Sequence, residues 1–132
     1  MTIITEAYRA DIELKRGNKA EADKIMNDLS KDYGECDGYL FELAQYYTKS
    51  GSYKEAIQLY EDSFNKDKKR PRYSDALLGM IDIYDIMGDI DKEIETYDRL
   101  LKLYKEEWKI SEDEATYLVA LEKKNKLLNK KK

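Results

Sequence analysis

The residues of this 132-residue chain that could take part in chemistry are mainly carboxylates and lysines, and there is no histidine. The absence of histidine excludes histidine-dependent catalytic triads, the H-E-x-x-H zinc motif and the commonest general base. The single cysteine, Cys36, has no histidine to activate it, so we interpret it as a small loop residue rather than a nucleophile. The sequence therefore predicts a protein that is not an enzyme.

Two segments contain residues found in ligand-binding loops, but their spacing does not fit. "GECDG", residues 34–38, has two glycines four apart without the Lys-Ser/Thr that follows in a phosphate loop. "DIYDIMGDIDKE", residues 82–93, is rich in aspartate, but its glycine is at the wrong offset for a calcium loop. We interpret these acids as a solvated helix face and expect neither a metal ion nor a cofactor.

Composition and charge predict one helix-rich domain that covers residues 1–132. Hydrophobic residues make up 42% and charged residues 39%, with one proline. Residues 122–132 hold six lysines and one glutamate, a local charge of +5. Because the whole chain carries −4, the other 121 residues carry −9. An acidic body gives no reason to expect direct nucleic-acid binding. The lysine-rich end is interpreted as complementing a helix dipole, with contact to phosphates or acidic lipid as the alternative.

The expected location is the cytoplasm, without a membrane association. No apolar run approaches the length of a membrane span, and the first residues do not have the pattern of a signal peptide. A single cysteine excludes an internal disulfide framework and favours a reducing compartment.

Glycines mark a repeat along the chain. Gly17, Gly51 and Gly88 are separated by 34 and 37 residues, and "KDKKRPRYS", residues 66–74, contains the only proline and accounts for the extra three. Each glycine lies between two apolar patterns of helical period, so each unit is expected to be two helices joined by a turn. The predicted hairpins span about residues 3–34, 37–70 and 74–105.

Small residues recur at fixed distances from these glycines. Ala10 and Ala44 lie seven residues before a glycine, and Ala22 and Ala56 lie five residues after one. We expect these alanines to allow close approach where the two helices of a hairpin cross. Four tyrosines occupy packing positions of the pattern and are expected in the core rather than stacked on bases: Tyr47, Tyr60, Tyr84 and Tyr97.

A seventh helix is expected over about residues 112–130. Ser111 and Glu114 have the spacing of a capping box, and an apolar stripe follows them. Ser74 is predicted to be the N-cap of the third hairpin. We expect the last helix to cover the open end of the row, with Trp108 buried at the junction.

The unit resembles the tetratricopeptide repeat. In the second hairpin, Leu43-Ala44 and Tyr47 match the family's first helix, Gly51 its turn, and Ala56 and Tyr60 its second helix. The resemblance covers roughly residues 3–105. It implies an all-α solenoid of three repeats with a C-terminal capping helix, and a protein- or peptide-binding scaffold that uses the concave groove.

The first and third hairpins match fewer positions. The first matches at Ala10, Gly17 and Ala22, but Arg9 and Glu13 stand where bulky apolar residues are usual. The third matches at Tyr84, Gly88 and Tyr97, but has Glu93 where a small residue is expected.

The same resemblance implies which residues line the groove. Phe41 and Leu78 are expected to be exposed apolar residues that a ligand covers, or else to be covered by the C-terminal helix. Acids outnumber bases in the set, which favours a basic segment with one or two apolar anchors. The predicted groove residues are Asp11, Phe41, Gln45, Lys49, Leu78, Asp82 and Asp85.

One class within this family holds the carboxylate of an acidic chaperone tail with lysine, arginine and asparagine. The positions here that match those donors carry none of the required groups, so the sequence predicts no affinity for acidic tails. They are Ala7, Asp11, Glu42, Asp75 and Gly79.

A second resemblance supports an alternative function. Residues 73–118 are similar to the C-terminal half of the bacterial transcriptional activator domain, although "EEW" replaces its usual turn and the proline before Ser111 is missing. That similarity implies a regulatory segment of a transcription factor.

Overall fold

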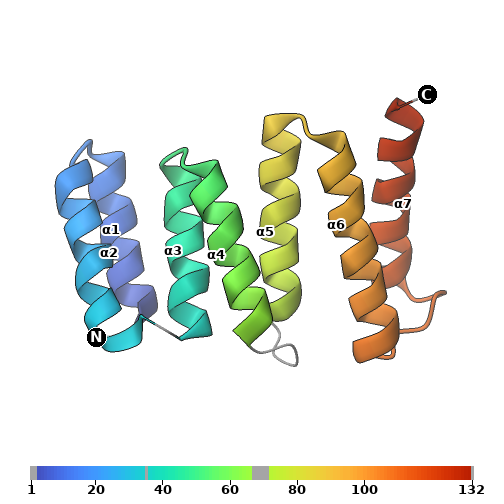
Figure 1. Cartoon of the computed structure of the whole chain (residues 1–132), viewed down its shortest axis with the longest axis horizontal. Coiled ribbons are helices and arrows are strands. Elements are labelled where there is room, and N and C mark those ends of the chain that lie inside the picture. Colours follow the sequence, from blue (N-terminus) through green and yellow to red (C-terminus); the bar gives the residue numbers. More distant parts are fainter. Residues whose placement is uncertain (1–2, 35, 67–71, 132) are drawn as a thin grey trace.

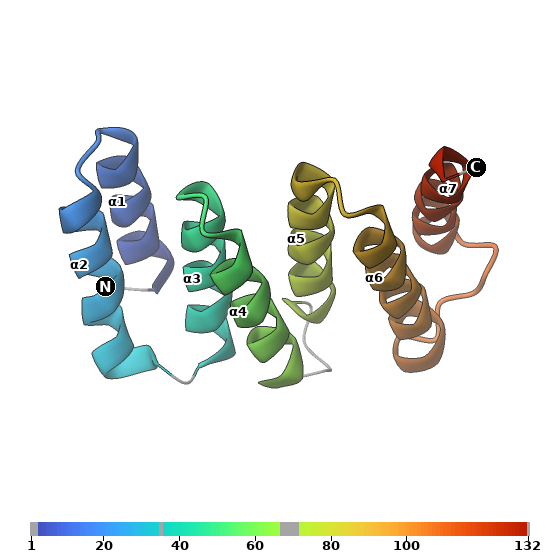
Figure 2. The same ribbon diagram turned by 45° about the horizontal axis from the view of Figure 1, so that its top comes forward.

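The computed structural model describes residues 3–34, 36–66 and 72–131, which form an all-α structure with no strand in those ranges. Three antiparallel hairpins stand side by side in a row, and a seventh α-helix ends the row (Figures 1 and 2). A short π-helical segment, η1, continues the sixth helix. The elements are α1 (Ile3–Lys15), α2 (Lys19–Tyr33), α3 (Asp37–Lys49), α4 (Tyr53–Lys66), α5 (Arg72–Met87), α6 (Ile90–Lys102), η1 (Leu103–Glu107) and α7 (Ala115–Lys130).

The hairpin turns form where the repeated glycines predict them. Gly17, Gly51 and Gly88 have φ angles of 84°, 83° and 74°, a left-handed conformation that is easy only for glycine. After the third turn, the Asp89 carboxylate accepts a hydrogen bond of 3.1 Å from the Lys92 backbone N–H and caps α6. The backbone thus reverses at the same place in each repeat.

The predicted crossing points of the first two hairpins are confirmed as tightly packed. All four alanines at these positions have no exposed surface: Ala10, Ala22, Ala44 and Ala56. In the third hairpin the position of Ala22 and Ala56 is taken by Glu93, which is also buried and only 5% exposed. A carboxylate side chain therefore occupies a site that holds a methyl group in the other two hairpins.

The first helices of the hairpins form one layer, because α1 contacts α3 and α3 contacts α5. Tyr60 of α4 reaches the interface with α5 and is 4% exposed. Its ring fits there because Gly79 has no side chain, since a Cβ at that position would be 2.4 Å from the Tyr60 ring. We call the surface of α1, α3 and α5 the α1–α3–α5 face.

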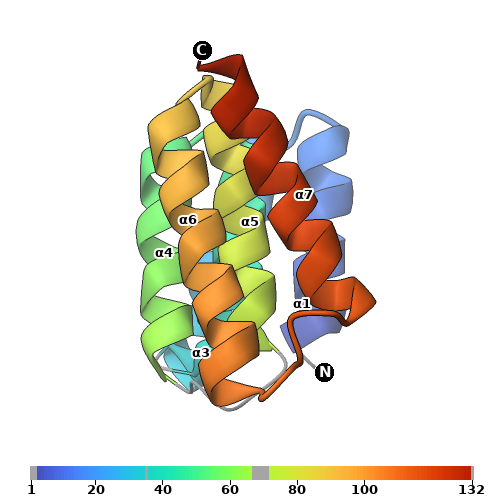
Figure 3. The ribbon, with the colours of Figure 1, turned by 90° about the vertical axis from the view of Figure 1, so that its right-hand side faces the viewer.

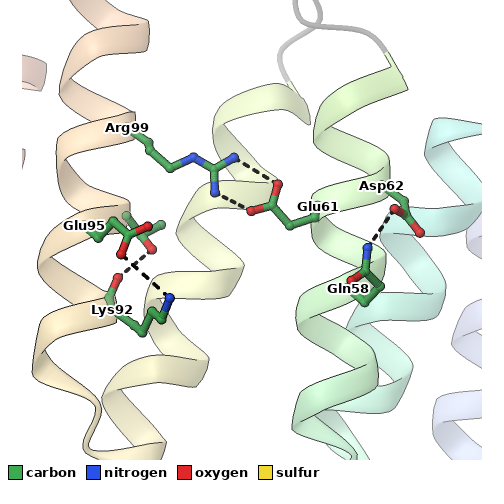
Figure 4. A network of polar contacts seen from close by, with 7 residues as sticks. Gln58, Glu61, Asp62, Lys92, Glu95 and Arg99 are labelled. Carbon is green, nitrogen blue, oxygen red and sulfur yellow. Dashed lines mark hydrogen bonds and ion pairs between the residues drawn. The ribbon is translucent and has the colours of Figure 1, made fainter.

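The second helices of the hairpins form the other layer, and an ion pair connects two of them, α4 and α6. The Arg99 guanidinium of α6 makes a two-pronged ion pair with the Glu61 carboxylate of α4, with Nη2 2.9 Å from Oε2 (Figure 4). The guanidinium carbon also lies 4.7 Å from the centre of the Phe64 ring. This contact joins consecutive hairpins across the row.

The last helix, α7, packs against α6 at the end of the row (Figure 3). Its buried residues, Ala120 and Leu127, join the apolar core that extends from α3 to α7. Lys124 pairs with Asp98 of α6 at 2.5 Å, and Lys131 pairs with Asp91 of the same helix.

Two predicted helix caps are wrong. Helix α5 begins at Arg72, so Ser74 lies inside it and is buried. Helix α7 begins at Ala115, and the Ser111 hydroxyl donates to the Asp113 carboxylate instead of capping the helix. Trp108, predicted to be buried, is partly buried, with its ring centre 5.3 Å from that of Tyr104.

Candidate functional site

A pocket of about 250 Å³ lies on the α1–α3–α5 face between α1 and α3. We call it the α1–α3 pocket. Helix α1 supplies residues one turn apart, and α3 supplies a second such set, because positions three or four apart share one helix face. The lining residues are Ile4, Ala7, Tyr8, Asp11, Glu42, Gln45, Tyr46 and Lys49.

The acid at the centre of the pocket, Asp11, is paired within the protein. It is 8% exposed, and its carboxylate oxygens lie 3.2 Å from Lys15 Nζ and 3.3 Å from Lys49 Nζ. Burial alone would raise the pKa of Asp11, but hydrogen bonds and charge from Lys15 and Lys49 outweigh it and hold the pKa below its usual value. Asp11 is thus a stabilised anion that also holds Lys49 against α1.

The pocket combines a rigid base with an apolar rim. Tyr46 is buried, and its hydroxyl donates a hydrogen bond to the Asp23 carboxylate of α2, which fixes the ring. Burial raises the pKa of Tyr46 and the bond to Asp23 raises it further, so the phenol remains a donor. At the rim, Ile4 and Tyr8 are 60% and 64% exposed. Large apolar groups are thus exposed beside a charged, pre-formed pocket.

Three of the seven predicted groove residues meet in this pocket, namely Asp11, Gln45 and Lys49. The exposure predicted for Phe41 is wrong, because its side chain is 9% exposed and packs edge-on against Tyr60, with 5.7 Å between ring centres. Helix α4 covers Phe41, whereas the prediction from the sequence was that a ligand or the C-terminal helix would cover it. A ligand therefore does not meet Phe41 on the surface.

The other three predicted groove residues follow one another along α5. Leu78 is 39% exposed, as predicted, and Asp82 and Asp85 are exposed one and two turns further on. They lie beyond the α1–α3 pocket, so the structure divides the predicted set between two places on the α1–α3–α5 face.

Asp82 and Asp85 form a group with Glu93 of α6, which we call the acidic cluster. Burial raises the pKa of Glu93, and the charge of Asp85, and to a smaller extent Asp82, raises it further, while Lys130 opposes the shift. Burial likewise raises the pKa of Asp82, again with Asp85 adding to it and Lys123 opposing it. The ionised forms of Glu93 and Asp82 are thus disfavoured, whereas that of Asp11 is favoured.

Sequence reasoning missed the apolar rim of the pocket and Glu93. Ile4 and Tyr8 lie seven and three residues before Asp11, the spacing of one helix face, so that periodicity was a usable signal. Glu93 was noted only as a departure from the small residue expected at its position. A charged residue at a position where close packing is expected is a sequence signal for a functional residue.

The lining of the α1–α3 pocket carries charged, polar and apolar side chains. In residues 3–34, 36–66 and 72–131 no set of three or more acidic, histidine or cysteine side chains is arranged to hold a metal ion. None of the described helices is both long and apolar enough to cross a bilayer. The described groups can form ion pairs, hydrogen bonds and apolar contacts with a ligand.

The sequence matches no model of a known protein family, and comparison with curated proteins finds no significant relative. The resemblance to the tetratricopeptide repeat therefore stays a prediction from the residues themselves.

Proposed function

We propose that the protein is a protein- or peptide-binding scaffold of tetratricopeptide type, and that its ligand lies along the α1–α3–α5 face. The observation that carries the proposal is the α1–α3 pocket, where Asp11, Gln45 and Lys49 line one cavity beside exposed Ile4 and Tyr8. A row of hairpins offers an extended surface of the kind that repeat proteins use for peptide ligands.

The surface charge favours a basic ligand with an apolar anchor. Asp11 is neutralised by its own lysines, but Asp82 and Asp85 add negative charge along the face. Opposite charge on the ligand speeds encounter and sets its orientation, and apolar contact at Ile4 and Tyr8 adds affinity. Acidic peptides ending in a free carboxylate are expected not to bind.

Selection from a random peptide display library tests the proposal. Selected peptides are expected to combine lysine or arginine with an apolar residue and to bind more weakly as salt rises. In calorimetry, Tyr8→Ala and Gln45→Ala should each weaken a selected peptide about fivefold or more, because each removes part of the pocket wall.

Met87→Ala is the matched control, since Met87 is 52% exposed and does not line the pocket. It should leave affinity unchanged. Full affinity in both pocket variants, with the fold intact by circular dichroism, would contradict binding at the α1–α3 pocket.

A further inference from the structure

The acidic cluster contains a buried carboxylate without a partner. Glu93 is 5% exposed, yet its carboxylate makes no hydrogen bond or ion pair with any residue in the described ranges. Burial of an unpaired charge costs free energy, so proteins normally satisfy such a group or replace it. The same position in the other hairpins holds Ala22 and Ala56.

The three acids lie on the two helices of one hairpin and act on one another electrostatically. Asp82 and Asp85 lie one turn apart on α5, and Glu93 follows the Gly88 turn on α6. Burial, and then the charges of Glu93, Asp82 and Asp85, raise the pKa of Tyr97, which follows Glu93 by one turn on α6. Helices α5 and α6 pack against each other, so the three carboxylates lie on adjoining helices on either side of the Gly88 turn.

The cations nearest the cluster do not neutralise it. Lys123 and Lys130 of α7 act on Asp82 and Glu93 electrostatically. Neither lysine comes within ion-pair distance of an acid in the described part of the chain, whereas Lys124 and Lys131 beside them do. Helix α7 packs against α6, and its C-terminal end lies on the same side of the molecule as the α5–α6 turn in Figures 1 and 3.

The cluster is open to a ligand. Asp82 and Asp85 are exposed. The oxygens of Glu93 are not among the unpartnered side-chain atoms of the described residues that are closed off from solvent, so they keep some contact with it. Leu78, 39% exposed, lies one turn before Asp82 and offers an apolar contact next to the acids.

We propose that Asp82, Asp85 and Glu93 form a subsite for an arginine side chain of the bound peptide. The planar guanidinium has five N–H donors and can bridge carboxylates on two helices, which a compact ammonium group does less well. This inference rests on the proposed function, because it names the basic residue that the α1–α3–α5 face selects. On binding, the guanidinium becomes the ion-pair partner that Glu93 does not have within the described residues.

The test uses acetyl-arginine-amide as the probe and the ¹⁵N-labelled full chain as the target. At fixed ionic strength, the probe is expected to shift the amide signals around Gly88, Glu93 and Tyr97 in a saturable way. Acetyl-citrulline-amide, nearly the same shape without the charge, should leave them in place. Equal shifts with both compounds, or none with the arginine derivative, would overturn the subsite.

Glu93→Gln separates binding from structure. It should weaken the arginine probe about fivefold or more and raise Tm by about 3 °C, because the amide keeps the shape and removes the unpaired charge. Glu95→Gln is the matched control, since the Glu95 side chain is 66% exposed on the same helix and should change neither value appreciably. A lower Tm in Glu93→Gln, or unchanged probe affinity, would overturn the inference.

The outcomes remain distinct from those of the display experiment. If selected peptides bind at the α1–α3 pocket and the arginine probe does not bind at Glu93, this inference fails and the proposed function stands. If the probe binds as expected and no peptide is selected, the proposed function fails and the cation subsite stands.

Discussion

The second and third hairpins differ at one equivalent position, five residues after the turn glycine. In the second hairpin Ala56 has no exposed surface and lets α4 approach α3. In the third, Glu93 is buried at 5% exposure with two acids of α5 nearby. Ala56 favours close packing of the two helices. A buried glutamate at the equivalent position is expected to lower stability, and in many proteins residues that lower stability belong to a binding site.

A similar contrast separates two buried acids, Asp11 of α1 and Glu93 of α6. Asp11 is buried with two lysine partners, and its pKa is lowered. Glu93 is buried with acidic neighbours, and its pKa is raised. Burial is common to both, so the charge of the neighbouring groups, and not the burial, decides whether the pKa of the carboxylate is lowered or raised.

The largest expected effect comes from transferring the carboxylate to the second hairpin. Ala56→Glu should lower the free energy of unfolding by about 3 kcal/mol or more, because no opening accommodates a charge at that crossing. Urea denaturation measures the loss, with Lys54→Glu on the exposed side as the control. If Ala56→Glu did not lower the free energy of unfolding, a glutamate at this position would carry no cost in either hairpin. That result would contradict the comparison between them.

Packing alone gives the next effect. Ala56→Leu should cost about 1–3 kcal/mol by overpacking the crossing of α3 and α4. Lys54→Leu, on the exposed side of α4, should do little. Equal denaturation midpoints for these two leucine variants would contradict the register of the hairpin.

Removing the lysine partners of Asp11 should leave it, like Glu93, as a buried carboxylate without an ion pair among the described residues. The Lys15→Ala, Lys49→Ala double variant is expected to lose about 1–2 kcal/mol at neutral pH, a modest figure because both lysines are largely exposed. Adding Asp11→Asn should restore most of that loss. If the triple variant is no more stable than the double one, Asp11 is not the cause.

The smallest expected effect is in the pH dependence of Glu93→Gln. The folded pKa of Glu93 is raised, so its favourable contribution is complete below the unfolded value and is lost as pH rises through the folded value. At pH 7 the variant should exceed wild type by about 1 kcal/mol, and the gap should close as pH falls toward 4.5. A gap that stays constant down to pH 4 in urea melts would contradict the raised pKa.

The hairpins could be predicted from the sequence because a left-handed turn nearly requires glycine and a close crossing nearly requires alanine. Both constraints are local, and Gly51 and Ala56 satisfy them as expected. The position of Phe41 depends on a contact between helices far apart in the chain. Tyr60 covers it only because Gly79 leaves space on α5, and that relation appears in no single helix pattern.

The candidate site was predictable only in part. Residues of one helix face share a surface, so the sequence grouped Asp11 with Gln45 and Lys49, and all three line the α1–α3 pocket. The relative register of α1 and α3, which makes that surface a pocket, depends on side-chain packing across the pair. The capping box at Ser111 is wrong because α7 begins at Ala115, four residues after the serine, and spacing alone does not decide where the first turn of the helix forms.

The most direct measurement is an NMR titration of the side-chain carboxyl groups, with and without acetyl-arginine-amide. Without the probe, the pKa of Glu93 should lie above 4.5 and that of Asp11 below 3.8. With the probe, the pKa of Glu93 should fall, because the guanidinium favours the ionised form, and that of Asp11 should stay in place. A Glu93 pKa at or below 4.5 in the free protein, or one that the probe does not move, would contradict the account.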